Sequence, residues 1–249
     1  MAAGERELMK RFHLATTTKL KFKAHHEIVT AADLAANSAI QRVLTKLTPG
    51  IPVLSEEGGS IQTSPALKAD LAWVLDPLDG TTNYTIRLPL WGISLALVRD
   101  GEPILGVISL PALHKHFHAT VGGGAWLGRD RLHVSKTKQL IETTGLLCYG
   151  YSNDDKRRGM NANRFLSMAS RTTRRLGSAV VEAAWIAMGH ADYAVLHGAK
   201  PWDVAAGALL VREAGGDVVT PKGKQWSLGK SDMVFSSPGV TKSVLKSMR

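Results

Sequence analysis

Two aspartates stand three residues apart at the end of an apolar segment. Residues 73–83 read WVLDPLDGTTN, so Asp76 and Asp79 flank a proline and precede Gly80. Pro77 restricts the backbone between the carboxylates, and Gly80 can adopt a conformation that turns successive N–H groups outward. Carboxylates bind Mg²⁺ and exposed N–H groups bind phosphate oxygens, so the segment suits a metal-phosphate site. An aspartate-rich turn that caps a helix is the alternative interpretation.

Two other apolar segments also end in carboxylates. Glu56 and Glu57 follow residues 51–54 (IPVL), and Asp203 stands where an apolar helix is expected to begin. Taken separately, the glutamates fit a solvated loop and Asp203 fits a helix N-cap. Taken together, three apolar elements end in carboxylates, which is the arrangement that a multi-metal phosphate site requires.

Strands and helices must bring these carboxylates together. Hydrophobic spacing and turn residues predict strands at 51–54, 71–75, 93–98, 104–109, 116–121, 146–149, 193–196, 218–219 and 233–235. The same reasoning predicts helices at 5–14, 33–44, 163–170, 179–188, 204–214 and 240–248. Strands dominate as far as residue 121, and strands alternate with helices after residue 143. We therefore expect an α/β (α+β) protein of layered helices and sheets. A boundary near 140 would divide it into subdomains 1–140 and 141–249, which together form one catalytic unit.

Composition and charge limit the other function classes. The 249 residues contain one cysteine, Cys148, which excludes an intrachain disulfide and suits a reducing compartment. No apolar run approaches the roughly 20 residues of a membrane span, and the charged N-terminus lacks a signal-peptide core, so we expect a soluble cytoplasmic protein. The net charge of +10 is spread along the chain without a zinc-finger spacing or an RNA-binding aromatic motif. Attraction of anionic substrates is the preferred interpretation, and nucleic-acid binding is the second.

Three further patterns have both a functional and a purely structural interpretation. His114, His116 and His118 alternate, and they fit an exposed strand face better than a zinc site, because no cysteine or acidic residue completes the set nearby. Residues 122–124 are glycines but lack the lysine of a P-loop, so a tight turn is the better interpretation. Gly177 and Ser178 follow two arginines at the start of a helix, where an anion can bind.

From about residue 26 to about residue 220 the sequence resembles the inositol monophosphatase family. The motifs that carry the resemblance are residues 73–83, the run WDVAAG at 202–207, EAGG at 213–216, the Glu56-Glu57 pair and IVTAAD at 28–33. This family shares a fold with fructose-1,6-bisphosphatases and 3′-phosphoadenosine 5′-phosphate phosphatases. The resemblance implies a layered αβαβα sugar-phosphatase fold, phosphomonoesterase activity with two or three Mg²⁺ ions, lithium sensitivity and a homodimer.

The resemblance also implies a role for each matching residue. One Mg²⁺ would be bound by Glu56, Asp76 and the backbone carbonyl of Leu78. A second Mg²⁺ would be bound by Asp76, Asp79 and Asp203, and a third, weaker ion by Glu56 and water.

The expected catalytic group comprises Glu56, Thr81 and Asp33. The Thr81 hydroxyl, hydrogen-bonded to Asp33, would orient the attacking water together with Glu56. The expected substrate contacts are Asp79, Gly80, Thr81, Thr82, Gly177, Ser178, Lys200 and Asp203.

The substrate is less closely defined. The run GTTN at 80–83 resembles the inositol-phosphatase version of the motif, which favours an inositol, polyol or sugar phosphate. However, Leu196 stands seven residues before Asp203, where inositol-specific members carry a glutamate, and Lys200 could instead bind a second anionic group. Fructose-1,6-bisphosphate, histidinol phosphate and 3′-phosphoadenosine 5′-phosphate are therefore rival substrates. A regulatory protein associated with RNA or transcription is the non-enzymatic alternative. Only 32 residues precede Asp33, which leaves the expected homodimer open.

Overall fold

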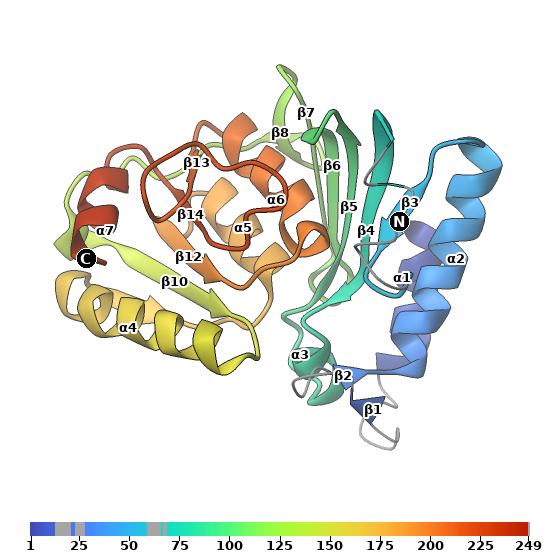
Figure 1. Ribbon diagram of the computed structural model, residues 1–249, viewed down its shortest axis with the longest axis horizontal. Coiled ribbons are helices and arrows are strands. Elements are labelled where there is room, and N and C mark those ends of the chain that lie inside the picture. The colour runs from blue at the N-terminus through green and yellow to red at the C-terminus, as the bar shows by residue number, and fades with distance from the viewer. Residues whose placement is uncertain (13–20, 23–27, 59–65, 67–68, 249) are drawn as a thin grey trace.

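A computed structural model describes residues 1–12, 21–22, 28–58, 66 and 69–248, and its helices and sheets alternate in layers (Figure 1). The larger sheet has seven strands in the order β3-β4-β5-β6-β7-β8-β9. The pair β3–β4 is parallel and the other neighbours are antiparallel. These strands are β3 (Val53–Ser55), β4 (Leu71–Asp79), β5 (Gly92–Arg99), β6 (Glu102–Leu110), β7 (Lys115–Thr120), β8 (Gly124–Leu127) and β9 (Asp130–Arg131).

The smaller sheet has five strands in the order β11-β10-β12-β14-β13. Strand β10 pairs in parallel with β11 and β12, and β14 runs antiparallel to β12 and β13. The strands are β10 (Thr144–Tyr149), β11 (Thr172–Arg174), β12 (Tyr193–His197), β13 (Asp217–Val219) and β14 (Met233–Ser236). Two short strands, β1 (Lys21–Phe22) and β2 (Ile28–Val29), pair separately near the N-terminus.

Three pairs of helices cover the faces of the two sheets (Figure 1). Helices α1 (Ala2–Phe12) and α2 (Ala31–Leu47) lie on the outer face of the larger sheet, and α4 (Asn153–Ala169) and α7 (Thr241–Ser247) lie on the outer face of the smaller one. Helices α5 (Ala179–Ala187) and α6 (Pro201–Glu213) lie between the sheets. The predicted αβαβα order is therefore confirmed. None of the described helices is long and apolar enough to cross a membrane.

The central helix pair carries the main core because it is apolar on nearly every side. Close approach depends on glycine at two positions. A Cβ atom on Gly106 of β6 would lie 3.0 Å from the Ala206 carbonyl oxygen, and one on Gly207 would lie 2.7 Å from the Cβ of Ala183. These contacts seat α6 against the larger sheet on one side and against α5 on the other.

The structure differs from the sequence-based expectations at several element boundaries. The strand predicted at 71–75 continues to Asp79, with its register against β5 shifting between Asp76 and Asp79. The helix predicted at 163–170 already begins at Asn153, because the Ser152 hydroxyl caps it by accepting the Asp155 N–H. His114 lies in a left-handed turn after the short 3₁₀ helix η5 (Pro111–Leu113), outside strand β7. The short elements β8, β9, β11 and α3 (Thr81–Thr85) were not predicted, because each offers only two to five residues of pattern.

Candidate active site

Strand β4 ends in the two aspartates and holds them with its own backbone. The Asp76 side chain is 1% exposed, and its Oδ1 accepts the Leu78 N–H at 2.9 Å. Gly80 follows with a φ of +84°, a left-handed conformation that favours glycine. A Cβ atom at Gly80 would also lie 3.0 Å from the Leu90 carbonyl oxygen. The glycine thus lets the chain turn sharply from the strand into helix α3.

Glu56 reaches the same place from the neighbouring strand. Strand β3 pairs in parallel with β4, and the Glu56 N–H donates to the Leu75 carbonyl at 3.1 Å. Because parallel strands point their carboxyl ends toward the same edge of a sheet, Glu56 lies next to Asp76.

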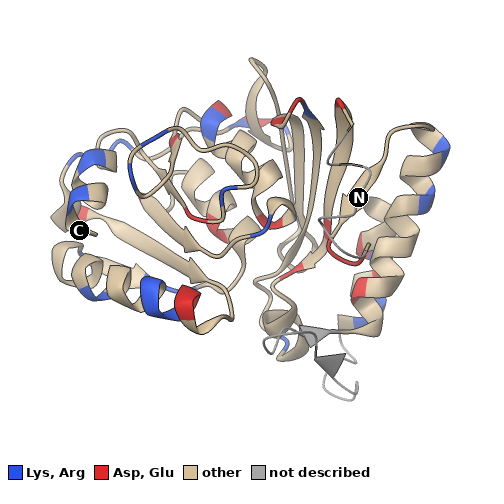
Figure 2. Cartoon of the chain, viewed as in Figure 1, with Lys and Arg blue, Asp and Glu red and all other residues tan. Residues whose placement is uncertain are grey.

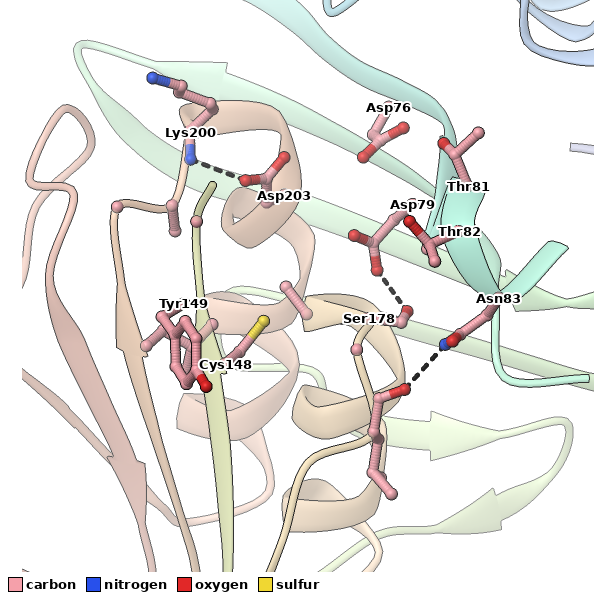
Figure 3. Close-up of a pocket in the computed structure, with 18 of the residues that line it drawn as sticks. Asp76, Asp79, Thr81, Thr82, Asn83, Cys148, Tyr149, Ser178, Lys200 and Asp203 are labelled. Carbon is pink, nitrogen blue, oxygen red and sulfur yellow. Dashed lines mark hydrogen bonds between the residues drawn. The ribbon is translucent and has the colours of Figure 1, made fainter. Parts of the chain in front are cut away.

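Asp203 comes from the other half of the chain, in the first turn of α6. It lies two residues inside the helix that begins at Pro201, and its Oδ2 accepts the Lys200 N–H at 2.7 Å. Asp203 is therefore not the N-cap, which the alternative interpretation of the sequence required. Figure 3 shows its carboxylate on the side of the cavity that faces Asp76 and Asp79.

These carboxylates share one cavity of about 520 Å³. All of the predicted metal and substrate residues line it, namely Glu56, Asp76, Leu78, Asp79, Gly80, Thr81, Thr82, Gly177, Ser178, Lys200 and Asp203. The cavity also has lining residues outside the predicted site, among them Asn83, Tyr149, Tyr151 and Arg175. Asn83 belongs to the motif at 73–83 and Arg175 to the arginine pair before Gly177, but the two tyrosines carried no local signal.

Crowding of acidic groups and burial dominate the electrostatics of the cavity. Burial, reinforced by the neighbouring carboxylates, raises the pKa of Asp76 and of Asp203 well above the usual range. Burial also raises the pKa of Asp79 to about 6, although the Ser178 hydroxyl and the Val180 N–H both donate to its carboxylate and oppose the shift. A cation in this cavity would favour the ionised carboxylates.

The donor set fits a hard divalent cation. Carboxylate and carbonyl oxygens from Glu56, Asp76, Leu78, Asp79 and Asp203 are the ligands that Mg²⁺ prefers. Within the described residues, no three Asp, Glu, His or Cys side chains are grouped closely enough to hold one ion. Protein donors orient two of the carboxylates: Asp79 Oδ2 accepts from the Ser178 hydroxyl and the Val180 N–H, and Asp203 Oδ2 accepts the Lys200 N–H.

Thr81 and Asp33 form a hydrogen-bonded pair at the wall of the cavity. The Thr81 hydroxyl lies 3.2 Å from Asp33 Oδ1 and 3.0 Å from the Leu78 carbonyl oxygen. Asp33 is 1% exposed and caps helix α2 by accepting the Thr30 N–H and hydroxyl at 2.8 and 2.5 Å. Burial raises the pKa of Asp33 to about 6, against the opposing effect of the Thr30 donors. The hydroxyl proton is thus directed into the protein, which leaves oxygen lone pairs free to accept a hydrogen bond.

The turn at residues 175–178 supplies the opposite wall. Ser178 caps helix α5 and donates from its hydroxyl to Asp79, and the Asn83 amide donates to the Leu176 carbonyl at 2.7 Å (Figure 3). The Arg175 guanidinium stacks on the Tyr149 ring at 3.8 Å from its centroid. Gly177 and Ser178, which the resemblance suggests as substrate contacts, therefore lie beside the carboxylates.

Two other contacts shape the rim of the cavity. The Thr82 hydroxyl and the Tyr151 hydroxyl lie 3.0 Å apart and so bridge the two halves of the chain. Lys200 lines the cavity, but its ammonium group points away from Asp76 and Asp79 (Figure 3). Leu196 is 1% exposed and pairs with Cys148 on the neighbouring strand, so this part of the floor offers no carboxylate to a substrate hydroxyl.

Known proteins resemble this chain over nearly its whole length. A model of the inositol monophosphatase family matches residues 2–249. An inositol-1-monophosphatase of Mesorhizobium japonicum is 33% identical over 254 residues, covering 100% of this chain and 92% of that protein. The Nus factor SuhB of Escherichia coli K12 is 33% identical, covering 97% of this chain and 90% of that protein. The crystal structure of extragenic suppressor protein suhB from Bartonella henselae is 26% identical with a TM-score of 0.92, covering 99% of this chain and 94% of that one.

Proposed function

The chain belongs to the inositol monophosphatase family, and we propose that it is a Mg²⁺-dependent phosphomonoesterase acting on a small phosphorylated metabolite. The family and its relatives indicate a phosphatase. The observation that carries the finer proposal is the convergence of four carboxylates, from β3, β4 and α6, on one cavity.

The proposed metal ligands follow from this arrangement. Glu56, Asp76 and the Leu78 carbonyl would hold one ion, and Asp76, Asp79 and Asp203 would hold a second. A third ion would be held more weakly by Glu56. When bound, Mg²⁺ neutralises the charge of the phosphate and lowers the pKa of a water molecule.

The protein groups then bind the phosphate and orient the water. The backbone N–H groups of Gly80 and Thr81 would donate to the phosphate oxygens, while Glu56 and the Thr81 hydroxyl would accept hydrogen bonds from the attacking water. Because the Thr81 proton is directed toward Asp33 or the Leu78 carbonyl, the Thr81 oxygen acts toward the water as an acceptor. The arrangement supports direct in-line attack without a covalent enzyme intermediate.

The substrate class that we infer is a polyol or sugar phosphate. The motif at 80–83 and the relative named inositol-1-monophosphatase favour this class. Leu196 argues against selectivity for inositol itself, because a leucine cannot accept a hydrogen bond from a ring hydroxyl. Fructose-1,6-bisphosphate, histidinol phosphate and 3′-phosphoadenosine 5′-phosphate remain the rivals. The cytoplasmic homodimer also stays a prediction.

A substrate panel tests the proposal. Release of free phosphate would be measured from inositol 1-phosphate, glycerol phosphates and the three rivals, with Mg²⁺ and with EDTA. We expect Mg²⁺-dependent release from at least one compound and its loss in Asp79→Asn. Asp130→Asn, at an exposed position in β9, is the matched control and should keep full activity. Failure of every compound, or full activity in Asp79→Asn, would overturn the proposal.

The relative named Nus factor SuhB supports a second candidate, a regulatory role that involves RNA or transcription proteins. Lys and Arg residues are spread along α2, α4 and α7 rather than gathered in one block (Figure 2). If the chain binds RNA, the association constant should fall steeply with salt and should be unchanged in Asp79→Asn. The absence of salt-dependent binding to structured and single-stranded RNA would remove nucleic acid from this candidate.

A further inference from the structure

A buried acidic residue outside the proposed ligand set lies behind the cavity wall. Glu182 is in the first turn of α5 and is 0% exposed. Its Oε1 accepts the Leu176 N–H at 3.3 Å. Its Oε2 is buried and has no hydrogen-bond partner among the described residues. Burying a carboxyl group in an apolar core is unfavourable, so its presence requires a reason.

Leu176, the residue that Glu182 contacts, is hydrogen-bonded through both its backbone N–H and its carbonyl. The Asn83 amide donates to the Leu176 carbonyl at 2.7 Å, and Glu182 accepts the Leu176 N–H. The chain then turns at Gly177, whose φ is +75°, and the next residue, Ser178, donates its hydroxyl to Asp79. Asn83 and Glu182 thus clamp a turn whose far end contacts a proposed metal ligand.

The charged and titratable groups that face Glu182 are Asp79, Arg175 and Cys148. Burial, with a smaller contribution from Asp79, raises the pKa of Glu182 to about 8, although N–H groups of the turn and Arg175 oppose the shift. At pH 7 the group is therefore mostly a neutral carboxylic acid. A primary amide has nearly the same shape and can accept the same N–H, so glutamine is the conservative replacement.

We propose that Glu182 is a positioning residue, which holds the turn at 175–178 so that Ser178 stays on Asp79 and Arg175 stays at the rim of the cavity. A purely apolar side chain would fill the same space in the core but would leave the Leu176 N–H without its acceptor. The turn would then lose one of its two anchors, and the geometry of Asp79 would loosen. This inference rests on the proposed Mg²⁺ site.

The test compares Glu182→Gln, Glu182→Asp and Glu182→Met, with Mg²⁺ affinity measured by calorimetry and the fold checked by circular dichroism. We expect the glutamine variant to stay within twofold of the wild type. The aspartate side chain is too short to reach Leu176, and the methionine side chain cannot accept the Leu176 N–H. Both variants should raise the Mg²⁺ dissociation constant at least fivefold and raise KM more than they lower kcat. Asp192→Asn is the control, because this buried aspartate binds Ser135 and Thr144 away from the cavity.

The outcomes separate the two proposals. If the wild type binds no Mg²⁺ and hydrolyses no ester, the proposed function fails. If the wild type binds Mg²⁺ but the aspartate and methionine variants bind it equally well, the positioning role is wrong. A glutamine variant as weak as the aspartate variant would also contradict it. Should the methionine variant not fold, the aspartate and glutamine variants still decide the question.

Discussion

Thr81 is the first residue of helix α3, and its hydroxyl makes two contacts at the wall of the cavity. Its hydroxyl lies within hydrogen-bond distance of both Asp33 and the Leu78 carbonyl, and its backbone belongs to the proposed phosphate-binding turn. The hydroxyl oxygen is therefore presented to the cavity as an acceptor. Asp33 does not line the cavity itself. Helix α2 positions it behind Thr81, where its Oδ1 lies within hydrogen-bond distance of the Thr81 hydroxyl.

Thr81→Val should lower kcat by about 10²–10⁴-fold, the range for a positioned group that assists proton transfer. Valine keeps the shape of threonine but has no hydroxyl to orient the water. KM should change little, because the backbone N–H of residue 81 remains. Steady-state kinetics on the best substrate of the panel would check this, with exposed Thr120→Val in β7 as the control. A kcat within threefold of the wild type would remove Thr81 from the mechanism.

Arg175 is the positively charged residue best placed to bind a second anionic group of a substrate. It lines the cavity, stacks on Tyr149 and has no carboxylate partner in the described part of the chain. Lys200, the residue that the sequence favoured for this task, points its ammonium group away from the carboxylates (Figure 3).

Arg175→Gln should therefore lower kcat/KM for a bisphosphate about tenfold or more, since a hydrogen bond to a charged group contributes about 1.5–3 kcal/mol. The value for a simple monophosphate should stay nearly constant. Arg174→Gln, whose side chain binds Thr172 and Thr173 outside the cavity, is the control. Equal losses on both substrates would show that Arg175 does not select for a second anion.

Helices α5 and α6 join the two sheets and carry residues of the site. Ser178 and Glu182 belong to the start of α5, and Asp203 to the start of α6. We propose that residues 1–140 and 141–249 act as one catalytic unit, because the carboxylates come from both segments. Asp79 contacts the start of α5 through Ser178 and Val180, so the packing of α5 against α6 links the surroundings of Asp79 to those of Asp203.

Gly207→Val should lower the free energy of unfolding by about 1–3 kcal/mol, as overpacking in a core does. A Cβ atom at this position already lies 2.7 Å from Ala183, so a branched side chain must push α5 and α6 apart. Urea unfolding would measure the change. Asn161→Val, at an exposed position of α4, controls for the helix propensity of valine. A cost no greater than that of the control would show that the two helices can separate freely.

At the scale of the whole molecule, a positively charged chain encloses an acidic cavity. The net charge is +10, while four carboxylates line one pocket. In the proposed function, the net positive charge would attract phosphate esters, and the acidic cavity would need cations before it could accept them. Stability and metal binding are therefore linked.

Without Mg²⁺, the free energy of unfolding should fall as pH rises from about 4 to about 6. Asp33 and Asp79 have pKa values raised to about 6, so the folded protein keeps protons that the unfolded chain has already released. The loss continues above pH 6, because the pKa of Glu182 is raised to about 8. The raised pKa values of Asp76 and Asp203 act in the same direction.

Saturating Mg²⁺ should flatten this slope, since the ion stabilises the ionised carboxylates in the folded state. Thermal unfolding in EDTA and in Mg²⁺ at several pH values would compare the slopes. Identical slopes in both conditions would contradict the metal site.

Local patterns in the sequence predicted much of this protein. Apolar runs such as 71–75 and 93–98 indicate strands from local sequence alone. The helical spacing of apolar residues at 179–188 and 204–214 indicates α5 and α6. The carboxylates were recognisable because each stands at one end of such a run, and the resemblance to family motifs assigned them to one site. The alternation of strands and helices after residue 143 was enough to predict the layered fold, although not the short strands β8, β9 and β11.

Contacts between residues far apart in the sequence could not be predicted from local patterns. Asn83 meets Leu176, 93 positions along the chain, and Thr82 meets Tyr151, 69 positions along. Neither pair leaves a local pattern, because its partners belong to separate segments that meet only in the tertiary structure. The same packing turns Lys200 away, places Arg175 at the rim and buries Glu182 behind it. Spacing along the chain reports on local backbone geometry, whereas hydrogen bonds across layers depend on how whole elements pack.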